Sequence, residues 1–328
     1  MKRKFSTDEQ LYRAGLYLKK LAGMDVSKAQ ADLPLGAGGF IVPEPMVDAI
    51  IPYREHYGAF RKNATVVQMT GDTMHYPRRS AEASTTWVLE GNTITDTTVN
   101  FDDVQAVAKK LTVLIKVSTE LMEDSAPDLA QFVAEEAGWA LAKEEDIAGF
   151  TGTGTSAHGG VAGAVGHLQN DGTAGRYIAT GHATIGAINN TDIGAIMGTP
   201  AAFAYDKNCA WYANAYTIGN CFAQLGGTAG GEFSTDPATG QIMYMGFPVH
   251  RTQALKGSGA TTGDMPILFG ALDKAAILFE RRGLDIRMST QRFLDTDQVA
   301  FLITERVDLN VHGCSGTSAG PLVGLQLG

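Results

Sequence analysis

The sequence predicts an α+β fold that combines one long helix, several β-strands and an extended ribbon. Three observations support this prediction. Apolar residues recur at helical spacing between Leu129 and Ile147, whereas residues 111–117 alternate one strongly apolar face with a mixed face, at the two-residue period of a strand. Residues 63–108 contain only short strand-like patches separated by small polar turns.

The composition is that of a globular protein. A chain of 328 residues can bury the core of one large or two moderate domains without cross-links. Hydrophobic residues make up 44% and charged residues 19%, which argues against wholesale disorder. Many of the 39 glycines stand in turn-like clusters, which favours many β connections.

Charge and cysteine usage exclude several classes of protein. The net charge is −9, but residues 1–30 carry +4, so the rest of the chain carries −13, and an acidic body argues against a dedicated nucleic-acid binder. The cysteines at 209, 221 and 314 form no C-x-x-C motif, which excludes a disulfide scaffold or zinc site and predicts buried thiols. No apolar run approaches the roughly 20 residues that span a bilayer, so we expect no membrane association.

The N-terminal third mixes helical and extended patterns. Residues 6–9 read as a capping box before apolar residues at helical spacing, which predicts a short surface helix ending near Gly23. Pro43 and Pro45 follow Phe40, Ile41 and Val42, so this extended segment suits a sheet edge or the surface of a partner. Residues 46–62 predict a helix interrupted at Pro52. The ribbon at 63–108 has too little apolar content for its own core, and an isolated hairpin is marginal in water, so we expect it to need a neighbouring subunit.

The long helix is predicted to start near Pro127 and to run for about 24 residues, or about 36 Å at a rise of 1.5 Å per residue. Its predicted apolar stripe is Leu129, Phe132, Val133, Ala137, Ala140, Leu141 and Ile147. The carboxylates at 135–136 and 144–146 are interpreted as a solvated face, or as partners for a neighbour's arginines, rather than as acid/base catalysts. Arg78 and Arg79 in the ribbon suit such a contact, because the guanidinium fork matches a carboxylate.

Candidate enzyme chemistry is weak throughout the chain. Gly316 to Gly320 fits the G-x-S-x-G pattern around Ser318, but no Asp and His follow, and we expect residues near the C-terminus to form a flexible tail. Paired glycines near 152 and 159 lack the rest of a dinucleotide or P-loop motif. The seven histidines are scattered, and those at 158, 167 and 182 are interpreted as exposed loop residues, so we expect no metal site and no cofactor.

The order of these motifs resembles that of tailed-phage major capsid proteins with the HK97 fold. The resemblance rests on Gly38 to Pro45, on Trp87-Val-Leu-Glu-Gly91, on the strand and long helix that end at Phe150-Thr-Gly-Thr-Gly154, and on later segments. These are Asn208 to Asn214, Gly246-Phe-Pro-Val249, and the closing strands at 266–270, 275–278, 283–286 and 297–306. It covers roughly residues 38–312, and its specificity lies in the order of the motifs.

This resemblance implies an N-terminal arm at 1–52 and an extended hairpin, the E-loop, at 63–108. It further implies a peripheral domain with the long spine helix at 53–62, 109–200 and 266–306, and an axial domain at 201–265 and 307–328. The implied function is self-assembly into hexamers and pentamers of an icosahedral head shell around double-stranded DNA. The alternatives are an encapsulin-type compartment shell, or a hydrolase using Ser318.

The resemblance also implies partners and contacts. Identical subunits are the main partners, scaffolding, portal and decoration proteins are further ones, and packaged DNA is touched weakly and non-specifically. The virion capsid is the expected location, after assembly in the host cytoplasm. The isopeptide cross-link of some relatives is not expected, since residues 63–108 contain no lysine and the other two positions fall near Asp297 and Thr304. The expected assembly contacts are Phe40, Ile41, Val42, Arg78, Arg79, Trp87, Glu90, Glu135, Glu144 and Glu145.

Overall fold

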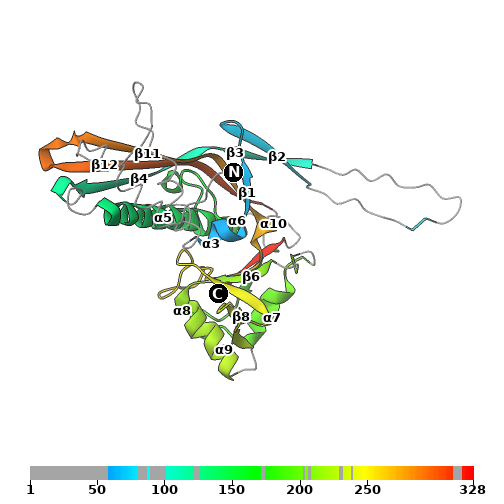
Figure 1. Cartoon of the computed structure of the whole chain (residues 1–328). Helices are drawn as coiled ribbons and strands as arrows, with labels where there is room; N and C mark the ends of the chain where they lie inside the picture. The colour runs from blue at the N-terminus through cyan, green and yellow to red at the C-terminus, as the bar shows by residue number, and fades with distance from the viewer. Residues whose placement is uncertain are drawn as a thin grey trace.

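A four-stranded sheet with the order β1-β11-β12-β4 forms one part of the molecule (Figure 1). The computed structural model describes residues 58–79, 87–88, 101–120, 126–170, 174–201, 204–205, 208–228, 232–237, 239–312 and 320–328. The strands of this sheet are β1 (Thr65–Gln68), β4 (Lys109–Ser118), β11 (Ala276–Phe293) and β12 (Gln298–Val311). Strand β12 pairs antiparallel with both β11 and β4, whereas β1 runs parallel to β11. The segment at 65–68 therefore belongs to this sheet, and not to the ribbon in which the sequence pattern placed it.

The long helix α5 (Ala126–Thr151) lies along one face of this sheet (Figure 1). The 26 residues of α5 agree with the predicted rod, and the alternation at 111–117 is confirmed, because those apolar side chains face the helix. Val133, Ala137 and Leu141 are fully buried against Phe301 and Ile303. Fully burying a side chain such as Phe301 contributes about 2–3 kcal/mol, so the helix is held by its apolar stripe.

The buried stripe of α5 differs from the predicted one. Phe132 is 53% exposed and Trp139 is 43% exposed, whereas Ala134, Ala142, Glu145 and Asp146 are buried. The C-terminal half of α5 buries additional positions because it is enclosed from more than one side: α3 (Ala59–Asn63) and α6 (Ala164–Asn170) both contact it there.

A seven-stranded sheet with the order β5-β13-β10-β6-β9-β8-β7 forms the other part (Figure 1). Its strands are β5 (Arg176–Ala179), β6 (Cys209–Ala213), β7 (Phe233–Thr235), β8 (Ile242–Tyr244), β9 (Phe247–Arg251), β10 (Ile267–Ala271) and β13 (Leu322–Leu327). Short helical segments accompany the two sheets: η1 (Ser156–His158), η2 (Ile185–Ala187), α7 (Asn190–Gly198), α8 (Ala215–Thr217), η4 (Ile218–Phe222), α9 (Ala223–Thr228), α10 (Leu272–Ala275) and η5 (Leu294–Thr296). The core of this part surrounds Trp211, whose indole Nε1 donates to the carbonyl of Tyr244 at 3.1 Å.

The C-terminal residues are not a flexible tail, so that prediction was wrong for 322–327. Strand β13 lies between β10 and β5, with Leu322, Val323 and Leu325 fully buried. Apolar residues at most of its positions suit a strand that is covered on both faces. Gly324 lies so close to Met265 that a Cβ atom would collide with the sulfur, which explains the glycine inside a buried strand.

Sheet membership also differs from the predicted domain ranges. Strands β5 and β10 lie in the seven-stranded sheet, and α7 packs against β5 and β13, although 109–200 and 266–306 were assigned to the other domain. Strand β5 follows β4 and α5 along the chain, and β10 precedes β11. Both β5 and β10 are nevertheless hydrogen-bonded to strands of the seven-stranded sheet. A shared apolar cluster around Phe60, Phe150 and Tyr212 joins the two parts. The edge-to-face contact of the Phe60 and Phe150 rings, at 5.3 Å between centroids, lies at this junction.

Candidate assembly surfaces

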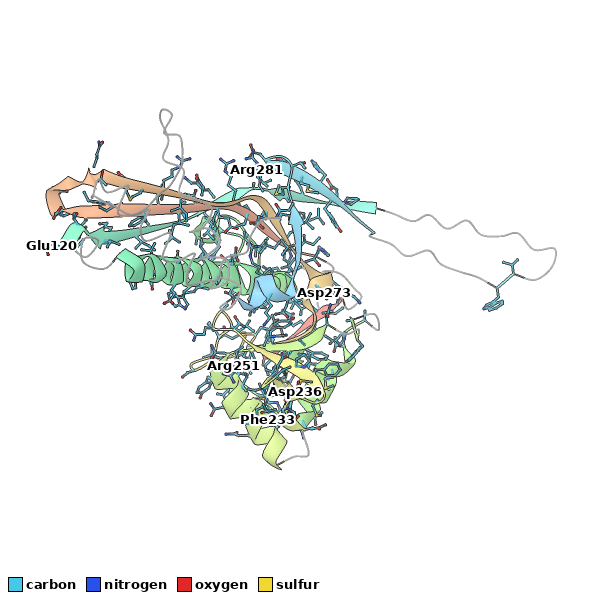
Figure 2. The ribbon with its side chains drawn as sticks, in the orientation of Figure 1. Glu120, Phe233, Asp236, Arg251, Asp273 and Arg281 are labelled. Carbon is cyan, nitrogen blue, oxygen red and sulfur yellow. The ribbon has the colours of Figure 1, made fainter. Side chains whose placement is uncertain are left out.

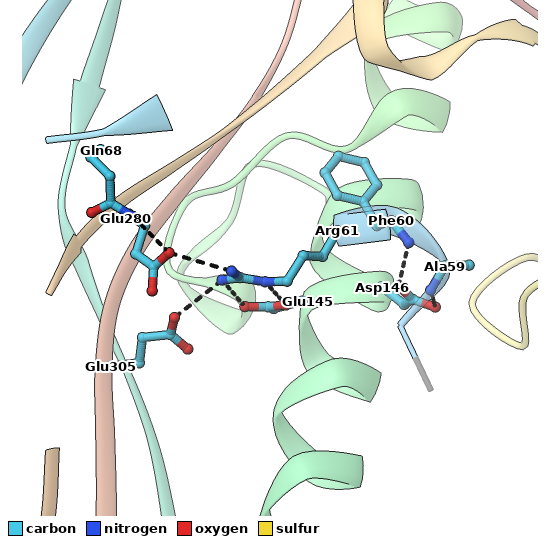
Figure 3. Close-up of polar contacts among 8 residues, drawn as sticks. All are labelled: Ala59, Phe60, Arg61, Gln68, Glu145, Asp146, Glu280 and Glu305. Atoms are coloured by element: carbon cyan, nitrogen blue, oxygen red, sulfur yellow. Dashed lines mark hydrogen bonds and ion pairs between the residues drawn. The ribbon is translucent and has the colours of Figure 1, made fainter. Parts of the chain in front are cut away.

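Arg61 binds three glutamates at the junction between α3, α5 and the four-stranded sheet (Figure 3). Its Nε and Nη2 atoms donate to the two carboxylate oxygens of Glu145, both at 3.1 Å. Nη2 also lies 3.1 Å from Glu305 Oε1, and Nη1 lies 3.4 Å from Glu280 Oε2. The side chains of Glu145 and Glu305 are 1% and 0% exposed, so one guanidinium fastens the spine helix to strands β11 and β12 from inside.

Asp146 holds the start of α3 from the neighbouring position on the helix (Figure 3). Its carboxylate accepts hydrogen bonds from the backbone N–H groups of Ala59 and Phe60, at 3.1 and 2.8 Å, and from the hydroxyl of Thr252 at 3.4 Å. Burial raises the pKa of Asp146 to about 6, because desolvation penalises the charged form more than the hydrogen bonds favour it. This carboxylate joins α5 to both α3 and the loop after β9.

The antiparallel hairpin β2 (Thr73–Arg79) and β3 (Phe101–Val107) leaves the body at the far end of the four-stranded sheet from the β11–β12 turn (Figure 1). Ala106 is fully buried against Phe279 at the base of the hairpin. The backbone N–H of Val107 donates to Asp308 at 2.9 Å, and Asp72 binds both Arg281 and Arg306. The base of the hairpin is therefore fixed on the face of the sheet opposite α5.

The outer described side chains of the hairpin are largely exposed, although Val104 is buried and Tyr76 is half-buried against Phe279. The side chain of Trp87 is fully exposed, at 105% of its reference area, and Val88 is 41% exposed. His75 and Asp103 form a cross-strand ion pair in which both side chains are more than half exposed. Tryptophan is enriched among the residues that carry most of the binding energy at protein interfaces, so an exposed Trp87 suits a contact with another molecule.

The structure describes only some of the other predicted contact residues. Arg78 and Arg79 are the last residues of β2, in register with residues 102 and 101 of β3. Residues 40–42 and Glu90 lie outside the described residues, as do Cys314 and Ser318. Glu135 is half-buried on α5, and Glu144 faces the imidazole Nδ1 of His158 at 3.1 Å.

Glu145 requires a correction, because it is buried and binds Arg61 of its own chain. The interpretation of residues 144–146 as a solvated acidic face therefore holds only for Glu144, which is 41% exposed. Sequence reasoning missed Arg61 and Asp72 altogether. Their partners stand 84 to 244 positions away along the chain, so no local spacing could have indicated them.

Other chemistry is not assembled within the described residues. No group of three or more His, Cys, Asp or Glu side chains is close enough there to hold a metal ion. The interpretation of His158, His167 and His182 as exposed loop residues was wrong, because all three are half-buried. His167 lies in α6, and His182 Nδ1 lies 2.7 Å from the buried carboxylate of Asp192. Cys209 and Cys221 are buried free thiols, as predicted.

The arrangement of a spine helix beneath a long sheet, a projecting hairpin and a second sheet-based domain is the HK97-like capsid fold, and the fold prediction is confirmed by solved structures. The capsid of an empty GTA particle matches with a TM-score of 0.63 and 17% identity, over 94% of this chain and 97% of that chain. The capsid of a native GTA particle matches with a TM-score of 0.61 and 16% identity, over 92% and 95%. A structure titled Mycobacterium phage Cain matches with a TM-score of 0.57 and 16% identity, over the same shares.

The phage capsid family model matches residues 38–313, so the chain belongs to the phage capsid family. It is a major capsid protein that forms a phage head shell of identical subunits, and its location is the virion capsid. A search of curated proteins finds no match. The family and the three capsid structures are structural proteins, and they favour neither the encapsulin nor the hydrolase alternative. Among the described helices, none is both long and apolar enough to cross a membrane.

Proposed function

We propose that this subunit forms hexamers and pentamers of an icosahedral shell around double-stranded DNA, and that the hairpin β2–β3 provides a principal contact between subunits. The observation that carries this proposal is a hairpin whose base is fixed and whose described outer part is largely exposed. Asp72, Ala106 and Val107 hold the base on the body, whereas Trp87 is fully exposed. An isolated two-stranded ribbon is marginal in water, which favours a partner surface for it.

A contact of this kind is heterologous, because a projecting hairpin meets a different surface on the next copy. Heterologous contacts that close produce rings, and rings of identical subunits can tile a shell. Each contact can be weak, since many repeated contacts raise the effective concentration of every further one.

The domain division follows the two sheets in this proposal. The four-stranded sheet with α3 and α5 is the peripheral domain, and the seven-stranded sheet with α7, α8 and α9 is the axial domain near the ring centre. Residues 1–52 act as the N-terminal arm and 69–108 as the E-loop. Phe40, Ile41, Val42, Arg78, Arg79, Trp87, Glu90, Glu135 and Glu144 remain the proposed contact residues.

The shell is held without covalent links and without catalysis in this proposal. The ribbon has no lysine, and Asp297 and Thr304 occupy the positions near which the resemblance places the other reactants. Packaged DNA is touched weakly, because an acidic subunit repels phosphates. Assembly takes place in the host cytoplasm, with separate scaffolding, portal and decoration proteins as further partners.

Electron microscopy and denaturing gels of the purified protein test this proposal together. We expect closed shells of uniform diameter built from hexamers and pentamers, and after boiling in SDS a single band at the subunit mass of 34.7 kDa. Particles from phage-producing cells should contain DNA and not a protein cargo. A ladder of covalent multimers would contradict the claim that the shell has no covalent links. A protein cargo in place of DNA would contradict the claim that the shell encloses DNA.

A further inference from the structure

Strand β11 contains two extra residues near the middle of the four-stranded sheet. From Glu280 to Asp285 it advances by five residues, whereas its partner β12 advances by three, from Val307 to Thr304. The pairing of β12 with β4 continues through this level without a shift. Each extra residue on one strand makes a β-bulge, which bends that strand and increases its twist. Two bulges therefore follow each other within 280–285, here called the double bulge.

Gly283 lies within the double bulge and is exposed. A Cβ atom at this position would meet no other atom within 4 Å, so no close contact requires the glycine. Glycine in a strand interior weakens the strand and commonly marks a bulge or a bend. Along the sheet this level lies between Asp273 and Glu120, as the position of Arg281 shows (Figure 2). The backbone of β11 is therefore weakly constrained at this level.

The apolar core between the sheet and α5 is interrupted at the same level. In β12, Phe301 and Ile303 belong to one apolar cluster, whereas Leu309 and Val311 belong to another. The buried Glu305 lies between these two pairs of residues. The sheet is therefore packed on two apolar clusters and not on one continuous core.

Three glutamates and one arginine form a polar layer between the two clusters (Figure 3). Glu145 separates the clusters along α5, as Glu280 does along β11 and Glu305 along β12. Arg61 binds all three carboxylates, at 3.1 to 3.4 Å. The polar layer and the double bulge therefore lie at one level of the domain.

A polar layer yields to small displacements more readily than an apolar core does. A gap of about 0.5–1 Å forfeits a quarter to a half of each dispersion contact, whereas the Coulomb energy of an ion pair falls only with the inverse of the distance. Space is also present at this level, because a hollow of about 140 Å³ is lined by Asp285, Thr304, Glu305 and neighbouring residues of the same sheet. Movement at this level therefore costs less than movement within either cluster.

We propose that the four-stranded sheet bends at the double bulge, so that its distal and basal halves change their relative angle. The distal half is 286–293 with 298–303. The basal half is 276–280 with 307–311, and β1 pairs with this half alone. Helix α5 passes the double bulge without a break, and long helices curve gently, so the bend is small.

This inference rests on the proposed function, because pentamers and hexamers place the same chain in surroundings of different curvature. A subunit that is rigid throughout would fit its neighbours well in one ring and poorly in the other. Bending at the double bulge gives one sequence two shapes while both apolar clusters stay closed. The hairpin base is bonded to Asp308 of the basal half, so the bend moves the β11–β12 turn relative to the hairpin.

Electron cryomicroscopy of assembled wild-type shells tests the proposal, because it shows the subunit in both kinds of ring. Subunits of a pentamer and of a hexamer are superimposed on the basal half. We expect deviations between Cα atoms to begin at 281–285 of β11 and 304–306 of β12 and to grow toward the β11–β12 turn, while each half superimposes on its own. A peripheral domain that superimposes as one rigid body would overturn the proposal, and so would a change of shape confined to the junction between the two sheets.

Gly283→Val gives a second test in solution. Valine restricts the backbone and favours a regular strand, and the structure leaves open space for its Cβ at a position without a positive φ. Unassembled subunits should keep the wild-type urea midpoint or exceed it, whereas shell closure, followed by light scattering, should slow about two- to fivefold. Ser289→Val, at a regularly paired position of the same strand, is the matched control and should assemble like the wild type.

A wild-type rate of shell closure for Gly283→Val, at an unchanged midpoint, would overturn the proposal. If Gly283→Val lowers the midpoint, Gly283→Ala replaces it in the same assay, because alanine adds only one methyl group to the open space. Failure of the wild type to form shells with both kinds of ring would instead overturn the proposed function.

Discussion

Replacement of Arg61 by methionine should destabilise the subunit more than the loss of any exposed ion pair. The substitution keeps an unbranched apolar side chain but removes the cation shared by Glu145, Glu305 and Glu280. Breaking a buried pair by removing one partner costs about 3–5 kcal/mol, because the remaining charge is left in a poorly solvated site. Glu145 and Glu305 are almost completely buried, whereas Glu280 is partly screened by solvent. We therefore expect a loss of about 4 kcal/mol near pH 7.

Urea unfolding of unassembled subunits, followed by tryptophan fluorescence, measures this loss as a lower midpoint at unchanged slope. Low protein concentration is needed, because assembly would itself stabilise the folded state. Arg287→Met is the matched control: the Arg287 side chain is 65% exposed, and loss of its pair with Asp285 should cost less than about 1 kcal/mol.

A double-mutant cycle with Glu145→Gln isolates the interaction. Once Glu145 is neutral, the further loss caused by Arg61→Met should be smaller, with a coupling energy of about 1–3 kcal/mol. The reasoning is refuted if Arg61→Met costs no more than Arg287→Met, or if the two changes at positions 61 and 145 are simply additive.

Three further predictions concern titration and the hairpin base. Asp146 has a folded pKa of about 6, above its ordinary 3.8, so its contribution to stability is present at low pH. That contribution falls by about 2 kcal/mol as pH rises from 4 to 6, and by about 3 kcal/mol over the whole titration. In Asp146→Asn this pH dependence, measured by urea midpoints, should disappear. His250 is half-buried and stacks on Tyr212, and desolvation lowers its pKa to about 4, so its contribution is present above pH 6.5 and falls by about 3 kcal/mol toward pH 4. His250→Gln should therefore resist acid better than the wild type, and equal acid sensitivity would contradict this. Asp72→Ala should increase hydrogen exchange in β2 and β3 at least about tenfold. The global unfolding midpoint should change little, because the contacts of Asp72 with Arg281 and Arg306 are exposed. Unchanged exchange in the hairpin would count against an anchoring role of Asp72.

Local patterns were sufficient to predict the elements whose hydrophobic period is regular. The alternation at 111–117 predicted β4, and the apolar spacing after Pro127 predicted α5, because each pattern reflects one buried face. Burial of Ala142, Glu145 and Asp146 departs from the predicted stripe, since the sequence does not tell which side of α5 will be covered by α3 and α6.

The contacts between distant segments could not be predicted from spacing. Arg61 meets Glu305 across 244 positions, and β1 pairs with β11 although its sequence resembles the neighbouring ribbon. Strand β13 was mistaken for a tail, because a short apolar run near a chain end has no period that reveals its sheet partners. Burial of Glu145 was missed for the same reason: its acidic neighbours suggested solvent, and only the fold places a cation beside it.

The central claim is that the hairpin obtains its stability from another subunit. Replacement of residues 80–100 by a two-residue Asn-Gly turn between Arg79 and Phe101 tests it most directly, because the fixed base of the hairpin is kept. Sedimentation velocity and circular dichroism of this variant should give folded, unassembled subunits under conditions in which the wild type forms shells. Shells of normal size from the shortened protein would contradict the claim.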